Sequence, residues 1–194
     1  QLEFANSLGS FASKLLGLPS VCTIHTTPSQ DMKVKSKIHQ EIEALSLRFF
    51  CDRIIAVSEE ARLFYIEISN VSPQKVITIY NGIDLTNFIN VDRYEARLEV
   101  RKELGIPLDA NLLATVAVLR HLKGIQFMIR ALPTVLDATP NVYYLIVGSG
   151  AHHDALVDEA DKDGVTEHVV FAGLRNDIPR LLAASDIFVL PTLT

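Results

Sequence analysis

Short apolar runs alternate with longer amphipathic segments along most of the chain, and turn or cap residues separate them. The short runs resemble buried strands, and the longer segments have the spacing of helices that bury one face. The pattern predicts seven strands: Ser20–His25, Arg53–Val57, Val76–Tyr80, Leu112–Val118, Val142–Val147, His168–Ala172 and Ile187–Leu190. It also predicts seven helices: Phe4–Leu16, Val34–Phe50, Glu59–Ile68, Glu95–Leu104, Ile125–Ala138, His152–Lys162 and Asp177–Ala184. This alternation is typical of an α/β fold with parallel sheets.

Two of the predicted helices carry clear local signals. Ser58 follows a strand directly and precedes Glu59 and Glu60. This order predicts an N-cap with acids in the first turn, where the helix dipole favours them. Pro133 lies inside the predicted helix Ile125–Ala138, where a proline removes a backbone donor and favours a kink. We therefore expect a well-capped start at Ser58 and an irregular helix around Pro133.

The segment Asp84–Ala110 interrupts the alternation and carries only one helical pattern. We interpret it as a crossing between two domains, with three predicted strands before it and four after it. The assigned boundaries are 1–90 for the end of a first α/β domain, 91–110 for the crossing and 111–194 for the beginning of a second. The sequence starts without a methionine and stops directly after a predicted strand. Both domains are therefore expected to be incomplete in this chain.

Composition narrows the class of protein. Apolar residues make up 48% and charged residues 21% of the 194 positions, as in globular domains. The net charge of −5 argues against a nucleic-acid partner, because such binding depends on neutralising phosphates. No apolar run approaches the ~18 residues of a membrane span. Cys22 and Cys51 both lie in apolar runs, which predicts buried free thiols in a reduced, cytoplasmic protein.

The sharpest chemical feature is the basic segment Leu119–Gly124 between a predicted strand and the next helix. Arg120 and Lys123 would stand at the carboxyl end of a parallel strand, beside the amide groups of a helix N-terminus. That combination favours a phosphate or diphosphate. Ordinary solvated loop charges are the alternative.

A second feature is the glycine turn Gly148-Ser149-Gly150 after the strand Val142–Val147. Glycines there let a backbone approach a ligand and leave amide donors at the start of a helix. The segment is a poor dinucleotide fingerprint, because His153 stands at the third glycine position and no acid follows the next strand. A tight turn between strand and helix explains the glycines equally well.

Two further positions are candidates because of where their strands end. His25 would stand at the carboxyl edge of the first sheet, where it can contact a substrate hydroxyl or exchange a proton. Asn81-Gly82 follows the third strand, and this dipeptide readily takes positive φ and reverses the chain. The histidines show no spacing that predicts a catalytic zinc. No nucleophile elbow and no Walker loop occurs in the sequence.

Taken together, these segments resemble the family 4 retaining glycosyltransferases, which have the GT-B architecture of two Rossmann-like domains facing a cleft. The resemblance covers nearly the whole chain. It rests on segments in the family's order and approximate spacing: Ile54–Glu59, Val76–Asp84, Lys123-Gly124, Ile146–Gly150, Val170–Gly173 and Ala184–Pro191.

The resemblance implies a role for each matching position. Lys123 corresponds to the lysine that holds the donor diphosphate with fixed charge in place of a metal, so no metal or other cofactor is expected. Val118 stands where the partner arginine usually lies, and Arg120 is its substitute. His25 matches the histidine at the donor sugar. The remaining matches lie along the donor cleft: the nucleobase loop at Gly173 and Leu174, the turn from Gly148 to Gly150, and the segment Asn81-Gly82.

The implied reaction transfers a hexose from a nucleotide-diphosphate sugar to a glycan or glycolipid with retention of configuration, as in bacterial lipopolysaccharide or exopolysaccharide synthesis. The family's glycine-rich loop would precede Gln1 and its glutamate pair would follow Thr194, so this chain alone is expected to be inactive. Three alternatives stay open: a sugar-nucleotide epimerase of the same architecture, an NAD-dependent oxidoreductase, and a non-catalytic relative that binds nucleotide sugars. Three lysines in Met32–Lys37 raise the question of peripheral contact with the inner face of the membrane, although a solvated helix start explains them more simply.

Overall fold

A computed structural model describes residues 3–25 and 37–193, with side chains for residues 5–25 and 41–193. The chain divides into two compact units, Gln1–Ile83 and Asp84–Thr194. We call them unit 1 and unit 2, and each is described by itself. The lysine-rich residues 32–36 and the predicted helix start at Val34 lie outside the described residues.

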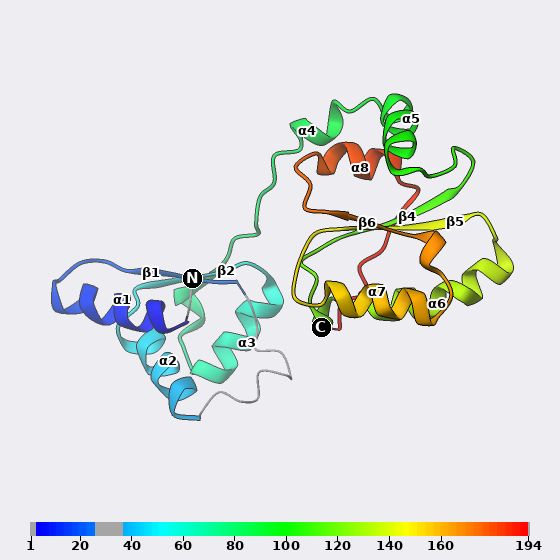
Figure 1. Ribbon diagram of the computed structural model, residues 1–194. Coiled ribbons are helices and arrows are strands. Elements are labelled where there is room, and N and C mark those ends of the chain that lie inside the picture. The colour runs from blue at the N-terminus through cyan, green and yellow to red at the C-terminus, as the bar shows by residue number, and fades with distance from the viewer. Residues whose placement is uncertain (1–2, 26–36, 194) are drawn as a thin grey trace. The chain divides into compact units, whose positions relative to one another are not determined.

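Unit 1 contains a three-stranded parallel sheet in the order β1-β2-β3. Helices α1, α2 and α3 lie along one face of this sheet (Figure 1). Cys22 and Cys51 are buried free thiols in its core, as predicted. The elements of unit 1 follow in this order: α1 (Glu3–Leu15), β1 (Val21–Ile24), α2 (Lys37–Phe49), β2 (Arg53–Ala56), α3 (Glu59–Ser69) and β3 (Val76–Thr78).

Unit 2 contains a four-stranded parallel sheet in the order β6-β5-β4-β7. Helices α5 and α8 cover one face, and α6 and α7 cover the other (Figure 1). Its elements are α4 (Thr86–Ile89), α5 (Arg93–Leu104), β4 (Asn111–Val116), α6 (Ile125–Ala138), β5 (Val142–Val147), α7 (His153–Lys162), β6 (Val169–Gly173), α8 (Ile178–Ala184) and β7 (Ile187–Phe188). The predicted three strands and four strands therefore form two separate parallel sheets.

Helix starts and ends follow local chemistry in both units. Ser58 caps α3, because its Oγ accepts from the Ala61 amide at 3.1 Å, as the sequence predicted. Asp92 caps α5 by accepting from the amides of Tyr94 and Glu95. Gly105 ends α5 in the left-handed conformation at φ 69°.

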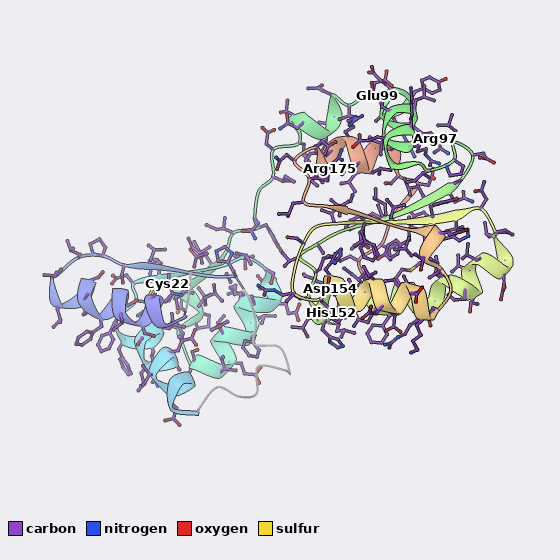
Figure 2. The ribbon with its side chains drawn as sticks, in the orientation of Figure 1. Cys22, Arg97, Glu99, His152, Asp154 and Arg175 are labelled. Carbon is purple, nitrogen blue, oxygen red and sulfur yellow. The ribbon has the colours of Figure 1, made fainter. Side chains whose placement is uncertain are left out.

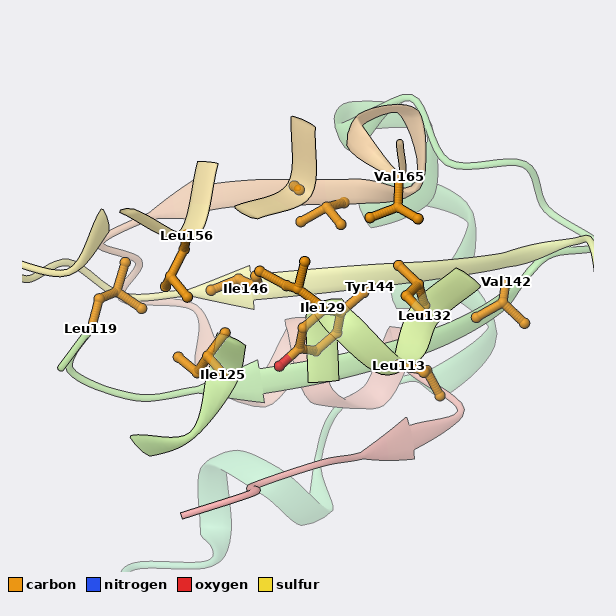
Figure 3. Packing of buried hydrophobic residues seen from close by; sticks show 12 residues of the cluster. Leu113, Leu119, Ile125, Ile129, Leu132, Val142, Tyr144, Ile146, Leu156 and Val165 are labelled. Carbon is orange, nitrogen blue, oxygen red and sulfur yellow. The ribbon is translucent and has the colours of Figure 1, made fainter. Parts of the chain in front are cut away.

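Helix α6 continues through Pro133 over the full predicted range. Its inward face explains why: Ile125, Ile129 and Leu132 are fully buried against the sheet. These side chains belong to the cluster in Figure 3, which also contains Tyr144 and lies between the sheet and helices α6 and α7. Burial of this apolar face offsets the single hydrogen bond that the proline removes.

The structure differs from the sequence prediction at the division between the units. The boundary lies between Ile83 and Asp84, so the whole of the predicted crossing 91–110 belongs to unit 2. Helix α5 packs along α8 and buries Val100 and Arg101. Its many charged residues resembled a solvated connection in the sequence. In the fold they form ion pairs with α8 and with the residues beside it.

Candidate functional site

A cavity of about 390 Å³ opens in unit 2 where β4, β5 and β6 end. Ligands of open parallel sheets bind beyond this carboxyl edge, and the volume falls in the usual range for small-molecule sites. The side chains around it are apolar except for Ser149 and Arg175. The lining residues are Val116, Ala117, Val118, Val147, Gly148, Ser149, Leu174, Arg175 and Ile178. The cavity therefore offers an apolar floor with a single cationic side chain.

The strand β4 ends two residues earlier than predicted, at Val116. Ala117 and Val118 follow this end and both line the cavity, although the Ala117 amide still donates to the Val147 carbonyl at 3.0 Å. The Val118 side chain is 53% exposed. In the sequence Val118 marked only the absence of an arginine, whereas in the fold it forms part of the apolar wall.

The glycine turn after β5 is shaped by its neighbouring loop. A Cβ on Gly148, at φ 135°, would lie 1.9 Å from the Ala117 carbonyl oxygen, and one on Gly150 would lie 2.2 Å from that of Leu119. The Gly148 amide donates to the Gly173 carbonyl at 2.8 Å. The N–H of Gly148 therefore ties β5 to the loop after β6. The tight turn between strand and helix explains both glycines, and Gly148 still lines the cavity.

The basic loop continues from Val118 into a short 3-10 turn, His121–Lys123. Arg120 is exposed and Lys123 is half-buried. Neither side chain takes part in a hydrogen bond or ion pair among the described residues, so both charges are available to a ligand. Gly124, at φ 69°, joins the turn to α6, whose first amides lie directly after it. A cationic loop at a helix N-terminus is suited to an anion.

The segment after β7 holds this loop in place. The Leu193 amide donates to the Leu122 carbonyl at 2.9 Å, and Thr192 Oγ1 donates to the same oxygen at 3.2 Å. A Cβ on Gly124 would lie 1.8 Å from the carbonyl oxygen of Pro191. The close approach of two backbones requires the glycine and positions the turn that carries Lys123.

Arg175 is the functional candidate that the sequence analysis missed. It lines the cavity from the loop between β6 and α8 (Figure 2). Its guanidinium donates to both carboxylate oxygens of Asp177, at 2.8 and 2.7 Å, and to Glu103 on α5. These hydrogen bonds lower the pKa of Asp177 to about 2 and raise that of Arg175. The spacing of Arg175 and Asp177 directly after a strand could have indicated this ion pair from the sequence. The contact with Glu103 could not be predicted in this way, because Glu103 is 72 positions away.

The other two predicted residues of this loop are placed as follows. Gly173 has φ 64°, and a Cβ there would meet nothing within 4 Å. Leu174 lines the cavity and is 79% exposed. The fold thus gathers Gly148, Leu174 and Arg175 around one cavity, whereas Gly150 lies outside its lining.

Three predicted site residues belong to unit 1. His25 follows β1 at the carboxyl edge of the sheet and is exposed. Asn81 and Gly82 follow β3 and are also exposed. The predicted reversal at Asn81-Gly82 is wrong, because neither residue has positive φ and no turn forms there. The chain leads onward to α4, so no antiparallel neighbour requires a reversal.

No helix among the described residues is long and apolar enough to cross a membrane. No group of three or more His, Cys, Asp or Glu side chains there is arranged to hold a metal ion.

The known relatives identify the family. Residues 96–194, just over half of the chain, match the family model for glycosyl transferases group 1, and residues 1–87 match that for glycosyltransferase family 4. This chain belongs to the glycosyl transferases group 1 and is of the family 4 type. The expected α/β fold of GT-B type is confirmed, and within it the cavity of unit 2 lies in the part that matches the group 1 model.

Individual relatives agree with this family. The glycosyltransferase MJ1607 of Methanocaldococcus jannaschii is 32% identical over 96% of this chain. An Escherichia coli protein, UDP-Gal:alpha-D-GlcNAc-diphosphoundecaprenol alpha-1,3-galactosyltransferase, is 28% identical over 96% of it. In both cases the match covers 49% of the relative. The chain therefore spans about half the length of these curated relatives.

Solved structures share the fold. Anabaena Alr3699/HepE, crystallised in complex with UDP, superposes with a TM-score of 0.87 at 23% identity, covering all of this chain and 52% of its own. WaaG, a glycosyltransferase involved in lipopolysaccharide biosynthesis, gives a TM-score of 0.74 at 18% identity, over 96% of this chain and 56% of its own.

Proposed function

We propose that this protein is a retaining hexosyltransferase, which transfers a hexose from a nucleotide-diphosphate sugar to a glycan or glycolipid acceptor. The observation that carries the proposal is the cavity at the carboxyl edge of unit 2, whose wall includes Val118, the residue directly before the basic segment Leu119–Gly124. Family membership supports the reaction class. The UDP-Gal in the name of the Escherichia coli relative, and the UDP bound to HepE, favour a UDP-sugar donor.

In this proposal the two parts of the donor bind to different chemistry. The nucleoside enters the apolar cavity, where Leu174 and Val118 remove it from water. The diphosphate binds Lys123 and Arg120, whose charges have no carboxylate partner among the described residues. Fixed cationic charge stabilises the diphosphate as it leaves the sugar, so the reaction needs no metal. His25 contacts the donor sugar.

The test is UDP binding to the 194-residue chain by isothermal titration calorimetry. Lys123→Ala removes one charge-assisted contact and is expected to weaken UDP binding by about 10- to 100-fold, which corresponds to ~1.5–3 kcal/mol. Lys162→Ala is the matched control, because Lys162 is an exposed lysine in the last turn of α7. It should leave the UDP affinity unchanged. EDTA should not alter the affinity of the wild-type chain.

Three results would contradict the proposal. UDP affinity that is equal in the wild-type and Lys123→Ala chains would remove Lys123 from the diphosphate site. A requirement for a divalent cation would overturn the metal-free mechanism. Tight binding of a nicotinamide dinucleotide in place of UDP would favour the oxidoreductase alternative.

A further inference from the structure

A cluster of five charged side chains lies next to the cavity of unit 2. Its members come from α5, from the loop after β6 and from α8: Glu99, Glu103, Arg175, Asp177 and Arg180. Arg175 is the member that lines the cavity. Each of its three guanidinium nitrogens donates to a carboxylate: Nε and Nη2 to Asp177, and Nη1 to Glu103. The guanidinium is therefore held along its edges from two different elements.

The second arginine completes the support. Arg180 donates to Glu103 at 3.3 Å, to Asp177 at 3.2 Å and to Glu99 at 2.9 Å. Glu103 and Asp177 each bridge both arginines, whereas Glu99 contacts Arg180 alone. Glu103 and Glu99 lie one turn apart on α5. Glu103 contacts Arg175 and Glu99 does not, so Glu99 is a matched control for Glu103.

The charges decide what Arg175 can offer to a ligand. Three carboxylates surround two guanidinium groups, so the cluster carries one negative charge in excess. Such a site attracts an anion weakly, in contrast to Lys123 and Arg120. Arg175 is therefore a poor substitute for the diphosphate arginine that the family has at the position of Val118. Three of its five N–H groups are used, all in the plane of the guanidinium, and a hydrogen bond in that plane leaves the flat face open to stack on an aromatic ring.

We propose that Glu103 and Asp177 are positioning residues that hold the Arg175 guanidinium as a flat wall for the base of the bound nucleotide. The proposal rests on the proposed function, because it requires a nucleotide in the cavity. It adds a division of labour between the two cationic sites: Lys123 binds the diphosphate, and the clamped Arg175 stacks on the base. Glu103 contributes without touching the ligand.

The experiment compares two ligands on single variants of the 194-residue chain. UDP contains the base and the diphosphate, and inorganic pyrophosphate contains only the latter. Glu103→Ala should raise the dissociation constant for UDP by about three- to tenfold and leave that for pyrophosphate unchanged. Glu99→Ala, which removes the same side chain one turn earlier, should change neither constant. Arg175→Lys keeps the charge but loses the plane, and should weaken UDP binding as Arg175→Ala does.

A double variant separates positioning from general destabilisation. Once Arg175 is replaced by alanine, Glu103→Ala should cause no further loss of UDP affinity, because no guanidinium remains to be held. Glu103→Gln keeps an acceptor oxygen and should recover part of the affinity. The melting temperature of each variant reports any loss of folding separately.

The outcomes distinguish this inference from the proposed function. Equal UDP affinities for Glu103→Ala and Glu99→Ala, or a parallel loss of pyrophosphate affinity, would overturn the positioning role. If Lys123→Ala changed neither ligand while Glu103→Ala still weakened UDP, the diphosphate assignment would fail and the Arg175 wall would stand. A wild-type chain that bound neither ligand would overturn both.

Discussion

At the scale of single residues, backbone contacts decide which glycines are required. Gly105 and Gly124 have the same φ of 69°. A Cβ on Gly105 would meet nothing within 4 Å, whereas one on Gly124 would meet the Pro191 carbonyl oxygen at 1.8 Å. Both positions favour glycine for its conformational freedom. Only Gly124 must also lack a Cβ, because the backbone at Pro191 passes directly against it.

This difference predicts unequal effects of one substitution. Gly105→Ala should lower the free energy of unfolding of unit 2 by about 1 kcal/mol, from the left-handed conformation alone. Gly124→Ala adds a backbone clash and should cost at least ~3 kcal/mol, with a displaced Lys123 turn and weaker UDP binding. Calorimetric unfolding of both variants measures the difference. Similar losses in the two variants would contradict the close approach of Pro191 to Gly124.

At the scale of secondary-structure elements, Asp186 joins α5, α8 and the sheet. Its Oδ2 accepts from the Leu112 amide on β4 and from the fully buried Arg101, both at 2.8 Å, and its Oδ1 accepts from Arg97 at 2.7 Å. Burial raises the pKa of Asp186, but the Leu112 and arginine hydrogen bonds outweigh it and the net shift is downward. Within the motif Ala184–Pro191, which the family resemblance used, Asp186 is therefore a structural residue.

The two arginines around Asp186 differ in exposure, and this gives a second stability prediction. Asp186→Ala leaves Arg101 buried without its carboxylate and should destabilise unit 2 by about 3 kcal/mol. Arg97→Ala removes only the partly exposed ion pair with Asp186 and should lower the free energy of unfolding by less than ~1 kcal/mol. Urea unfolding measures both. A larger loss for Arg97→Ala would show that the exposed pair, not the buried one, joins these elements.

At the scale of the whole molecule, acid should weaken unit 2 through its ion pairs. Hydrogen bonds from Arg175 lower the pKa of Asp177 from 3.8 to about 2, and Arg175 also lowers that of Glu103. A carboxyl whose pKa is lowered by folding stabilises the fold above its unfolded pKa and loses that contribution as the pH falls through its folded value. The stability from this cluster is thus complete above about pH 5 and is lost as the pH falls towards 2.

The check is the urea midpoint of unit 2, followed by hydrogen exchange, between pH 5 and pH 2. Asp177→Asn should flatten the fall in stability over this range, because the proton-linked carboxyl is gone. Asp161→Asn is the control, since Asp161 is exposed on α7 and its side chain forms no ion pair among the described residues. An unchanged pH dependence in Asp177→Asn would show that the cluster does not govern acid stability.

The sequence predicted elements better than it predicted their environment. The strand Val142–Val147 and the helix Ile125–Ala138 occur as predicted, since apolar periodicity is a local property. The Ser58 cap was predictable for the same reason. Helix α5 was placed in a crossing, because its charged residues show their partners only after α8 packs beside it. Lys123 was predictable from its loop, whereas Arg175 needed Glu103, 72 positions away.

The sequence by itself determined the α/β class, the separation into three and four strands, and the basic loop before α6. Each of these features depends on residues that are close together in the sequence. Tertiary structure alone decided that the glycines at 148 and 150 accommodate a crossing loop, that Asn81-Gly82 does not turn, and that two carboxylates hold Arg175 at the cavity. The physical reason is distance along the chain. Steric exclusion and charge neutralisation act between atoms that meet only after the helices have packed on the sheet.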